Sequence, residues 1–205
     1  MALVFWEQAV NDLSARDLVM GRIIRFCNDS MPEEQGDAFT TLARAIAGQQ
    51  ISVKAAASVW QKVTTLIPEI TPATLMATEI NLLRTCGLSA RKVDYLRDLS
   101  RHFLEEGLGT INWHDLDDEI LIRKLVEVKG IGRWTAEMFL IFHLHRPDIL
   151  PLDDLGLQRA VSMHYNASQP IDKQMIRIIA ESWQPWRTVA TWYLWRSLDP
   201  IPVSY

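Results

Sequence analysis

Only two cysteines, Cys27 and Cys86, occur among the 205 residues. Two cysteines cannot form the four-cysteine sites of a structural zinc ion or an iron–sulfur cluster, and no Cys-x-x-Cys pair is present. We expect both to be buried free thiols. The five histidines form no metal-ligand pattern either, because His143 and His145 at i and i+2 cannot share a helix face. We therefore predict no cofactor and no metal bound by side chains.

Long hydrophobic runs are also lacking. The longest, around 138–144, is interrupted by His143 and followed by a charged and proline-containing segment, so it is too short to cross a bilayer. The first twelve residues have no basic region leading into an apolar stretch, and they include Glu7 and Asp12, so they do not resemble a signal peptide. We expect no membrane partner and a cytoplasmic location, associated with the nucleoid if the source is bacterial.

Positive charge is scarce. The chain has 21 Lys and Arg against 25 Asp and Glu, which gives a formal net charge of -4. Proteins that hold nucleic acid by bulk electrostatics normally have clustered basic residues and a high pI. Any nucleic-acid role must therefore depend on local geometry.

The sequence does contain ample material for a core, with 48% apolar and 22% charged residues. Apolar residues recur at helical spacing almost throughout, and no convincing run of strict alternation is present, so the pattern predicts an all-α protein forming one domain over residues 1–205. Two serines are placed as N-caps, Ser52 before a helix to residue 66 and Ser89 before one to about residue 104. Three further helices are expected over 5–13, 17–28 and 38–48.

The most informative segment is 121–160, where two apolar helical patterns flank Lys129-Gly130-Ile131-Gly132. Two glycines around one apolar residue predict a tight helical hairpin, with Ile131 packed inward and both glycines in backbone conformations closed to other residues. The amides that open the second helix would carry the positive end of its dipole, which suits a phosphate group without much net charge. Lys129 and Arg133 would add local charge. An ordinary turn between two helices is the alternative.

At these residues the sequence resembles the helix–hairpin–helix DNA glycosylase superfamily. The stretch 128–136, VKGIGRWTA, is similar to that family's hairpin, and 150–156, LPLDDLG, is similar to its Gly/Pro-rich loop ending in the catalytic aspartate. Two further stretches match, AGQQIS at 47–52 and CGLS at 86–89 with Lys92. Within the superfamily the chain resembles the bacterial 3-methyladenine DNA glycosylase II branch, in a compact form too short for the N-terminal β-domain of longer members.

The resemblance implies a two-lobed helical bundle with a cleft between the lobes. Lobe one would cover about 36–150, and lobe two about 1–35 together with 151–205. It also implies a monofunctional glycosylase, expected to be a monomer, that flips alkylated purines such as 3-methyladenine out of damaged double-stranded DNA and excises them hydrolytically in base excision repair.

The catalytic role falls on Asp154 by this resemblance. Breaking an N-glycosidic bond develops oxocarbenium character on the sugar, which a fixed carboxylate stabilises. Asp153 is one residue away, and an alignment shifted by one would exchange the two. Either aspartate could instead serve only as the N-cap of the following helix.

Aromatic residues are expected to line the base pocket. The resemblance places Trp134 and Trp195 there with Met138 and Asp153, and a tryptophan face attracts a cationic base by about 0.5–2 kcal/mol. Lyase members of the family have a lysine nucleophile where this chain has Trp134, so no Schiff base is expected. The alternative for any tryptophan is core packing, which we favour for three others, Trp183, Trp186 and Trp192.

Gln50, with Gln49 adjacent, matches the position that fills the gap left by a flipped base. An exposed polar loop is the alternative reading of both. Family hairpins can also hold a monovalent cation through backbone carbonyls, which would map to Val126, Val128 and Gly130. The remaining DNA-binding residues implied by the resemblance are Ser52, Ser89, Lys92, Lys129, Gly130, Gly132, Arg133 and Thr135.

Two other functions remain open from the sequence. A non-catalytic helix–hairpin–helix module would bind damaged and undamaged duplex equally. A glycosylase with the same architecture could instead remove a deaminated or neutral alkylated base.

Overall fold

The computed structural model describes residues 5–27 and 36–198, and within them the chain is helical with no strand. The all-α prediction is confirmed. The described residues divide into two compact units, one formed by 5–27 with 140–198 and the other by 36–139. The boundary between the units therefore falls within helix α9, Arg133–Phe142. The lobe boundary expected from the sequence was near residue 150.

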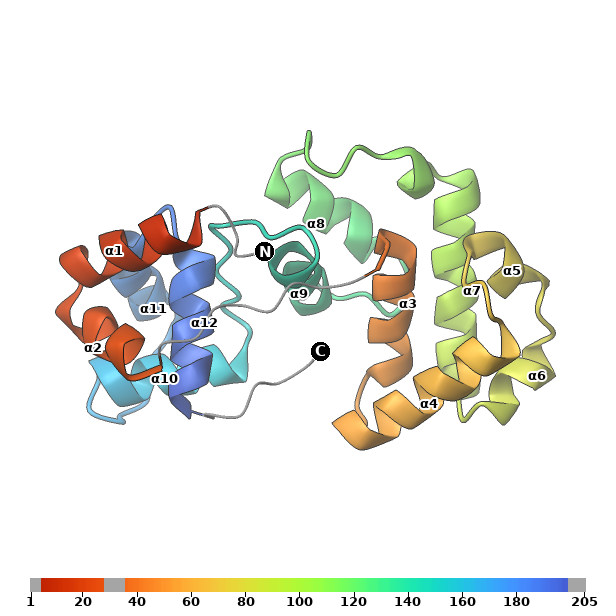
Figure 1. Cartoon of the computed structure of the whole chain (residues 1–205), viewed down its shortest axis with the longest axis horizontal. Helices are drawn as coiled ribbons and strands as arrows, with labels where there is room; N and C mark the ends of the chain where they lie inside the picture. Colours follow the sequence, from red (N-terminus) through yellow and green to blue (C-terminus); the bar gives the residue numbers. More distant parts are fainter. Residues whose placement is uncertain (1–4, 28–35, 199–205) are drawn as a thin grey trace. The chain divides into compact units, whose positions relative to one another are not determined.

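The unit built from residues 36–139 is organised around α7, Ala90–Glu105, which packs against α3 and α5 (Figure 1). Its other helices are α3 (Ala38–Gly48), α4 (Val53–Leu66), α5 (Pro72–Ala77), α6 (Ile80–Thr85) and α8 (Asp118–Val126), followed by the start of α9.

Side-chain caps explain where these helices begin. Ser52 accepts a hydrogen bond from the Ala55 amide at 3.3 Å, and Ser89 accepts one from the Lys92 amide at 3.2 Å. Each hydroxyl satisfies a backbone donor that has no partner inside its helix. Both predicted caps are confirmed, and α4 ends at Leu66 as expected.

The core of this unit lies along α7. Val93, Leu96 and Leu99 recur at helical spacing and are at most 2% exposed, as the apolar pattern requires. A run of edge-to-face and tilted ring contacts continues the core on one side, from Phe39 through Phe103 and Trp113 to Phe139. Helix α7 therefore contributes the central core residues of this unit and also contacts its neighbouring helices α3 and α5.

The second unit surrounds α12, Arg187–Leu198, whose residues are buried on nearly every side. Around it stand α1 (Trp6–Arg16), α2 (Leu18–Cys27), α10 (Leu155–Tyr165) and α11 (Lys173–Ala180). The first helix extends one turn beyond its expected end at residue 13, and residue 28, the expected end of the second, lies outside the described residues.

Asp17 joins three parts of this unit. Its carboxylate accepts hydrogen bonds from the Val19 and Met20 amides at the start of α2, from the Tyr165 hydroxyl at 2.7 Å and from the Trp183 indole at 3.0 Å. Trp183 is completely buried. One carboxylate thus fixes α2, the end of α10 and the turn after α11 together.

The three tryptophans assigned to packing are structural to different degrees. Trp183 and Trp192 are core residues, at 0% and 3% exposure, as predicted. Trp186 is only half-buried, where it stacks on Phe5 and donates to Asp12 at 2.9 Å.

Cys86 is buried as expected, but Cys27 is only half-buried. Within the described parts of the chain, none of the helices has both the length and the apolar character needed to cross a membrane.

Two leucines on α7 test this core. Leu99 is fully buried, so Leu99→Ala should lower the free energy of unfolding by about 2–5 kcal/mol, since the substitution leaves a cavity. Leu104 on the same helix is 51% exposed, and Leu104→Ala should cost well under 1 kcal/mol. Urea denaturation measures both, and equal losses would contradict the assignment of α7 as the core helix.

Candidate functional site

The expected helical hairpin is present between α8 and α9. The Val128 amide donates to Leu125 O and the Ile131 amide to Val128 O, both at 3.1 Å, so the turn closes immediately after α8. Ile131 is 3% exposed, which confirms that it packs inward. Gly130 has a φ of +84°, as predicted, but Gly132 is not in the left-handed region, so that part of the prediction is wrong. One left-handed glycine is sufficient because the chain enters α9 directly from Gly132.

Gly130 is also required by its neighbour on α7. A Cβ atom at Gly130 would lie 2.2 Å from Cδ2 of Tyr95, so the Tyr95 ring occupies the space that a side chain would need. The hairpin therefore lies against α7 at backbone distance. At this point glycine is needed both for conformation and for close approach.

A buried carboxylate fixes the residue before that glycine. Asp98 on α7 is 6% exposed and accepts a hydrogen bond from the Lys129 amide at 2.8 Å. Burial acts to raise the pKa of Asp98, but hydrogen bonds from Arg101 and from the Lys129 amide outweigh it, so the pKa is lowered. Asp98 is therefore charged at neutral pH and holds the hairpin turn to α7. It was absent from the sequence predictions because 31 residues separate it from its partner.

The loop between α3 and α4 is bonded to the same turn. Gln49 is half-buried and its side-chain amide donates to the carbonyl of Gly130 at 2.8 Å. Gln50 is exposed at the tip of this loop, with a φ of +57° that few residues other than glycine adopt. The two adjacent glutamines thus differ, because Gln49 joins the loop to the hairpin while Gln50 extends outward.

Two of the three basic residues expected to contact DNA are engaged within this unit. The Lys92 ammonium donates to the carbonyl of Ala47 at 2.7 Å in the last turn of α3, and burial lowers its pKa. Arg133 donates to Glu137 at 2.9 Å and to both carboxylate oxygens of Glu119, a contact that raises the pKa of Arg133. Both cations therefore already have oxygen partners.

The other predicted DNA-binding residues have varied surroundings. Lys129 is exposed, with its ammonium 3.8 Å from an Asp94 carboxylate oxygen, a separation typical of weak surface pairs. Thr135 is half-buried in the first turn of α9, and Gly132 is exposed. Ser52 and Ser89 are both exposed and use their hydroxyls as helix caps. No observation tests the DNA contacts of these residues, which stay predictions.

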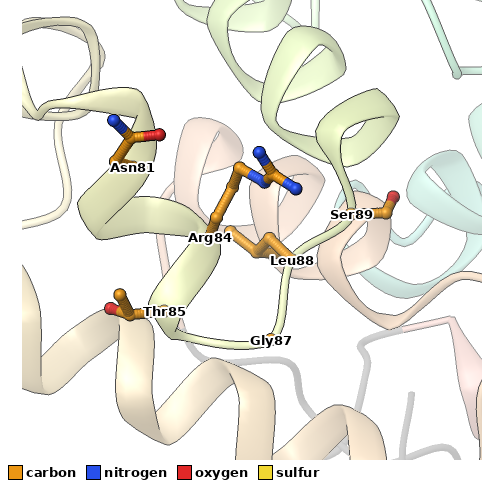
Figure 2. A pocket seen from close by; sticks show the side chains of 6 residues that line it. All are labelled: Asn81, Arg84, Thr85, Gly87, Leu88 and Ser89. Carbon is orange, nitrogen blue, oxygen red and sulfur yellow. The ribbon is translucent and has the colours of Figure 1, made fainter.

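A shallow pocket at the turn between α6 and α7 brings the predicted Ser89 together with Asn81 and Arg84, which were not predicted (Figure 2). Asn81 and Arg84 on α6 and Ser89 at the start of α7 lie around it. All three are exposed. Their amide, guanidinium and hydroxyl groups are hydrogen-bond donors, which the sequence could not associate without knowing how α6 turns into α7.

In the unit that contains α10, Asp154 and Asp153 have opposite environments. Asp154 is 8% exposed, and its Oδ1 accepts hydrogen bonds from the Leu157 amide at 2.6 Å, as the N-cap of α10, and from the Trp195 indole at 2.7 Å. Asp153 is exposed and pairs with Lys173. The N-cap reading of Asp154 is confirmed, and its catalytic role stays a prediction.

The loop that leads to Asp154 is fastened to the start of α12. Thr188 accepts from the Ile149 amide at 2.9 Å and donates to the carbonyl of Arg146 at 2.6 Å, while Arg187 forms two hydrogen bonds with Asp148 at 2.7 and 2.8 Å. Helix α12 therefore holds both the beginning of this loop and, through Trp195, its end.

The residues predicted to line the base pocket fall in both compact units. Trp134, in the first turn of α9, is 38% exposed, and Met138 one turn later is 7% exposed. Trp195 on α12 is half-buried and stacks on Phe142 with ring centroids 5.9 Å apart. The role of these residues as pocket walls stays a prediction.

The carbonyls expected to hold a monovalent cation have other partners in part. Val128 O accepts from the Ile131 amide and Gly130 O from the Gln49 side chain, although each carbonyl oxygen has a second lone pair. Carbonyl oxygens are ligands that suit a hard cation, and the site formed by Val126, Val128 and Gly130 stays a prediction. Among the described residues, no cluster of three or more His, Cys, Asp or Glu could hold a metal.

An all-α chain with a tight glycine-containing hairpin, followed by a buried aspartate that caps the next helix, has the architecture of a helix–hairpin–helix repair protein. The family model for HhH-GPD superfamily base excision DNA repair proteins matches residues 43–185. The chain belongs to this superfamily.

Individual relatives agree with that assignment. The chain is 32% identical to DNA-3-methyladenine glycosylase 1 of Schizosaccharomyces pombe, over 90% of this chain and 84% of the relative. Its fold matches a 3-methyladenine DNA glycosylase from the same yeast in complex with abasic DNA, with a TM-score of 0.77, 31% identity and coverage of 93% and 96% of the two chains. A DNA-3-methyladenine glycosidase from Bacillus halodurans matches with a TM-score of 0.83 and 31% identity over 93% of this chain and 89% of that one.

The two hairpin glycines provide a matched test. Gly130→Ala should destabilise the protein, by more than the roughly 1 kcal/mol usual for a glycine-to-alanine change at positive φ, because its Cβ would collide with Tyr95. Gly132→Ala should leave stability almost unchanged, since no atom lies within 4 Å of its Cβ. Denaturant unfolding of the two variants checks this, and comparable losses at both positions would show that the turn is not held against α7 as described.

Proposed function

We propose that this protein is a DNA glycosylase that removes alkylated purines, 3-methyladenine among them, from duplex DNA in base excision repair. The observation that carries the proposal is the buried Asp154 carboxylate, held by two hydrogen bonds at the start of α10. Membership of the superfamily and the names of the relatives, which are 3-methyladenine glycosylases, support the same substrate class.

The proposed reaction begins with a base flipped out of the helix stack. The bond between C1′ of the sugar and the base nitrogen breaks, and its electron pair leaves with the base, which neutralises the positive charge of an alkylated purine. The negative carboxylate of Asp154 stabilises the oxocarbenium-like sugar. A water oxygen then bonds to C1′ and gives up its proton to the carboxylate, leaving an abasic site.

Recognition of the leaving base is assigned to aromatic and polarisable surface. Trp134 is exposed enough on α9 to stack on a flipped base, and a cationic ring gains from contact with an indole face. Met138 and Trp195 are proposed as further walls. Gln50, exposed at the loop tip in a left-handed conformation, is proposed to fill the gap in the duplex.

DNA is proposed to be held by backbone as well as by side chains. Amides at the start of α9 lack acceptors within the helix and present the positive end of its dipole to a phosphate. The engagement of Lys92 and Arg133 with protein oxygens favours this mode over bulk charge. We propose that the protein acts as a monomer on damaged duplex, with a monovalent cation at the hairpin as a structural component.

Asp154→Asn tests the catalytic role directly. The change should lower release of 3-methyladenine from alkylated duplex DNA by at least 100-fold, since an amide cannot supply the negative charge that the transition state needs. The comparison is Asp153→Asn, which alters the exposed neighbour paired with Lys173 and should lower excision far less than Asp154→Asn does. Full activity in Asp154→Asn would rule out the assignment.

The same assay separates the alternatives. No excision by the unchanged protein, with equal binding of damaged and undamaged duplex, would indicate a binding module. Excision confined to a deaminated or neutral alkylated base would show a glycosylase whose substrate is not a cationic alkylated purine.

The absence of lyase activity is proposed from Trp134, which stands where lyase members have a lysine. An indole has no amine to form a Schiff base, so the product should be an intact strand with an alkali-labile abasic site. Reaction with single-lesion duplex in the presence of borohydride should yield no covalent protein–DNA complex. A trapped complex, or strand cleavage without alkali, would show that another amine acts as the nucleophile.

A further inference from the structure

The indole of Trp195 is directed edge-on at the proposed catalytic carboxylate. Its Nε1 donates to Oδ1 of Asp154 at 2.7 Å, and the Leu157 amide donates to the same oxygen at 2.6 Å. Trp195 lies on α12, 41 residues further along the chain. The carboxylate is therefore held by one donor from its own helix and by a second from a different helix.

Gly156 provides the room for this contact. A Cβ atom there would lie 3.1 Å from Cδ1 and 3.3 Å from Nε1 of Trp195, and 3.0 Å from Oδ1 of Asp154. Distances of 3.0–3.3 Å are tighter than nine in ten real Cβ contacts, so a side chain at this position would press on both members of the hydrogen bond. The glycine has no positive φ, which means that space rather than backbone conformation is what it supplies.

The opposite constraint comes from Phe142. Its ring stacks on Trp195 with an interplanar angle of 15° and a centroid separation of 5.9 Å. This offset stacking covers one face of the indole and restrains its rotation. The direction of the Trp195 N–H group is thus set by Phe142, which covers one face of the indole, and by Gly156, which leaves room along its edge.

The geometry points to Trp195 as a positioning residue for Asp154, an inference that rests on the glycosylase function proposed above. Two donors converging on Oδ1 restrain the rotation of the carboxylate, so its orientation is fixed before the sugar binds. A carboxylate oriented in advance is the condition for electrostatic stabilisation of a transition state.

A positioning role differs from that of a pocket wall. A wall contributes through the aromatic face and acts on the base, so its effect depends on which base is bound. A positioned carboxylate acts on the sugar, which is the same for every lesion. The two roles therefore predict different patterns across substrates.

The test is Trp195→Phe, which keeps an aromatic ring beside Phe142 and removes only the N–H donor and part of the ring area. We expect single-turnover excision to slow by about 10- to 100-fold, the range for a lost hydrogen bond to a charged group. The factor should be the same for a cationic base, 3-methyladenine, and a neutral one, hypoxanthine, provided that the unchanged protein excises both. If it excises only one, the binding comparison below carries the test.

The matched control is Trp192→Phe on the same helix. Trp192 contacts the same Phe142 ring, in an edge-to-face arrangement with ring centroids 6.4 Å apart and an interplanar angle of 76°. Its indole nitrogen has no hydrogen-bond partner among the described residues. Removing that N–H should leave the excision rate within about twofold of the unchanged protein, because no hydrogen bond is lost.

Binding of two abasic-site analogues provides a readout that packing alone would not alter. A pyrrolidine analogue carries a positive charge in the sugar ring, whereas a tetrahydrofuran analogue is neutral. Trp195→Phe should reduce the preference for pyrrolidine about 10-fold or more while leaving tetrahydrofuran affinity nearly unchanged. Gly156→Ala should act in the same direction, because its Cβ presses on the same hydrogen bond.

The outcomes distinguish this inference from the function on which it rests. Loss of rate and of pyrrolidine preference in Trp195→Phe, but not in Trp192→Phe, supports it. An unchanged rate and preference, or a loss that affects only the cationic base and both analogues equally, overturns positioning and leaves the glycosylase intact. Absence of excision by the unchanged protein overturns the proposed function itself.

Discussion

A carboxylate removed from water must be satisfied by donors inside the protein, and in each compact unit a buried aspartate fixes a turn of the chain in this way. Asp98 accepts from the amide of Lys129 in the hairpin, and Asp154 accepts from the amide of Leu157 at the start of α10. In both cases the donor is backbone, so the charge fixes the path of the chain. The location of the hairpin and of the proposed catalytic group both depend on this arrangement.

The same two aspartates differ in what else they bind. Asp98 also meets the guanidinium of Arg101 at 2.8 Å, so its charge is largely compensated by a cation. The two donors given for Asp154, an amide and an indole, come from the start of α10 and from α12, and both orient its carboxylate.

Local features of the fold were predictable because their causes are local in sequence. Ser52 and Ser89 each accept a hydrogen bond from an amide three residues further on, and Ile131 packs inward between two helical patterns. A few neighbouring residues were therefore sufficient to predict these features. Gly132 was misjudged because a pair of glycines does not reveal which one bears the left-handed turn. The partners of Gln49 and Lys92 lie 81 and 45 residues away, and no pattern in the sequence connects them. The resemblance likewise placed Trp195 in an aromatic pocket, but did not indicate that its indole edge would bond to a carboxylate.

The contact between Gly130 and Tyr95 limits how this protein can change over evolutionary time. Glycine at this position is held by two independent requirements, a left-handed backbone and the nearness of a ring. Trimming Tyr95 to a smaller residue would relieve only the second, so no single replacement elsewhere makes Gly130 dispensable. Tyr95 is under a weaker constraint, since a smaller side chain there would leave a gap without opposing the turn. Substitutions at this contact should therefore accumulate on the α7 side first, while the hairpin sequence stays fixed.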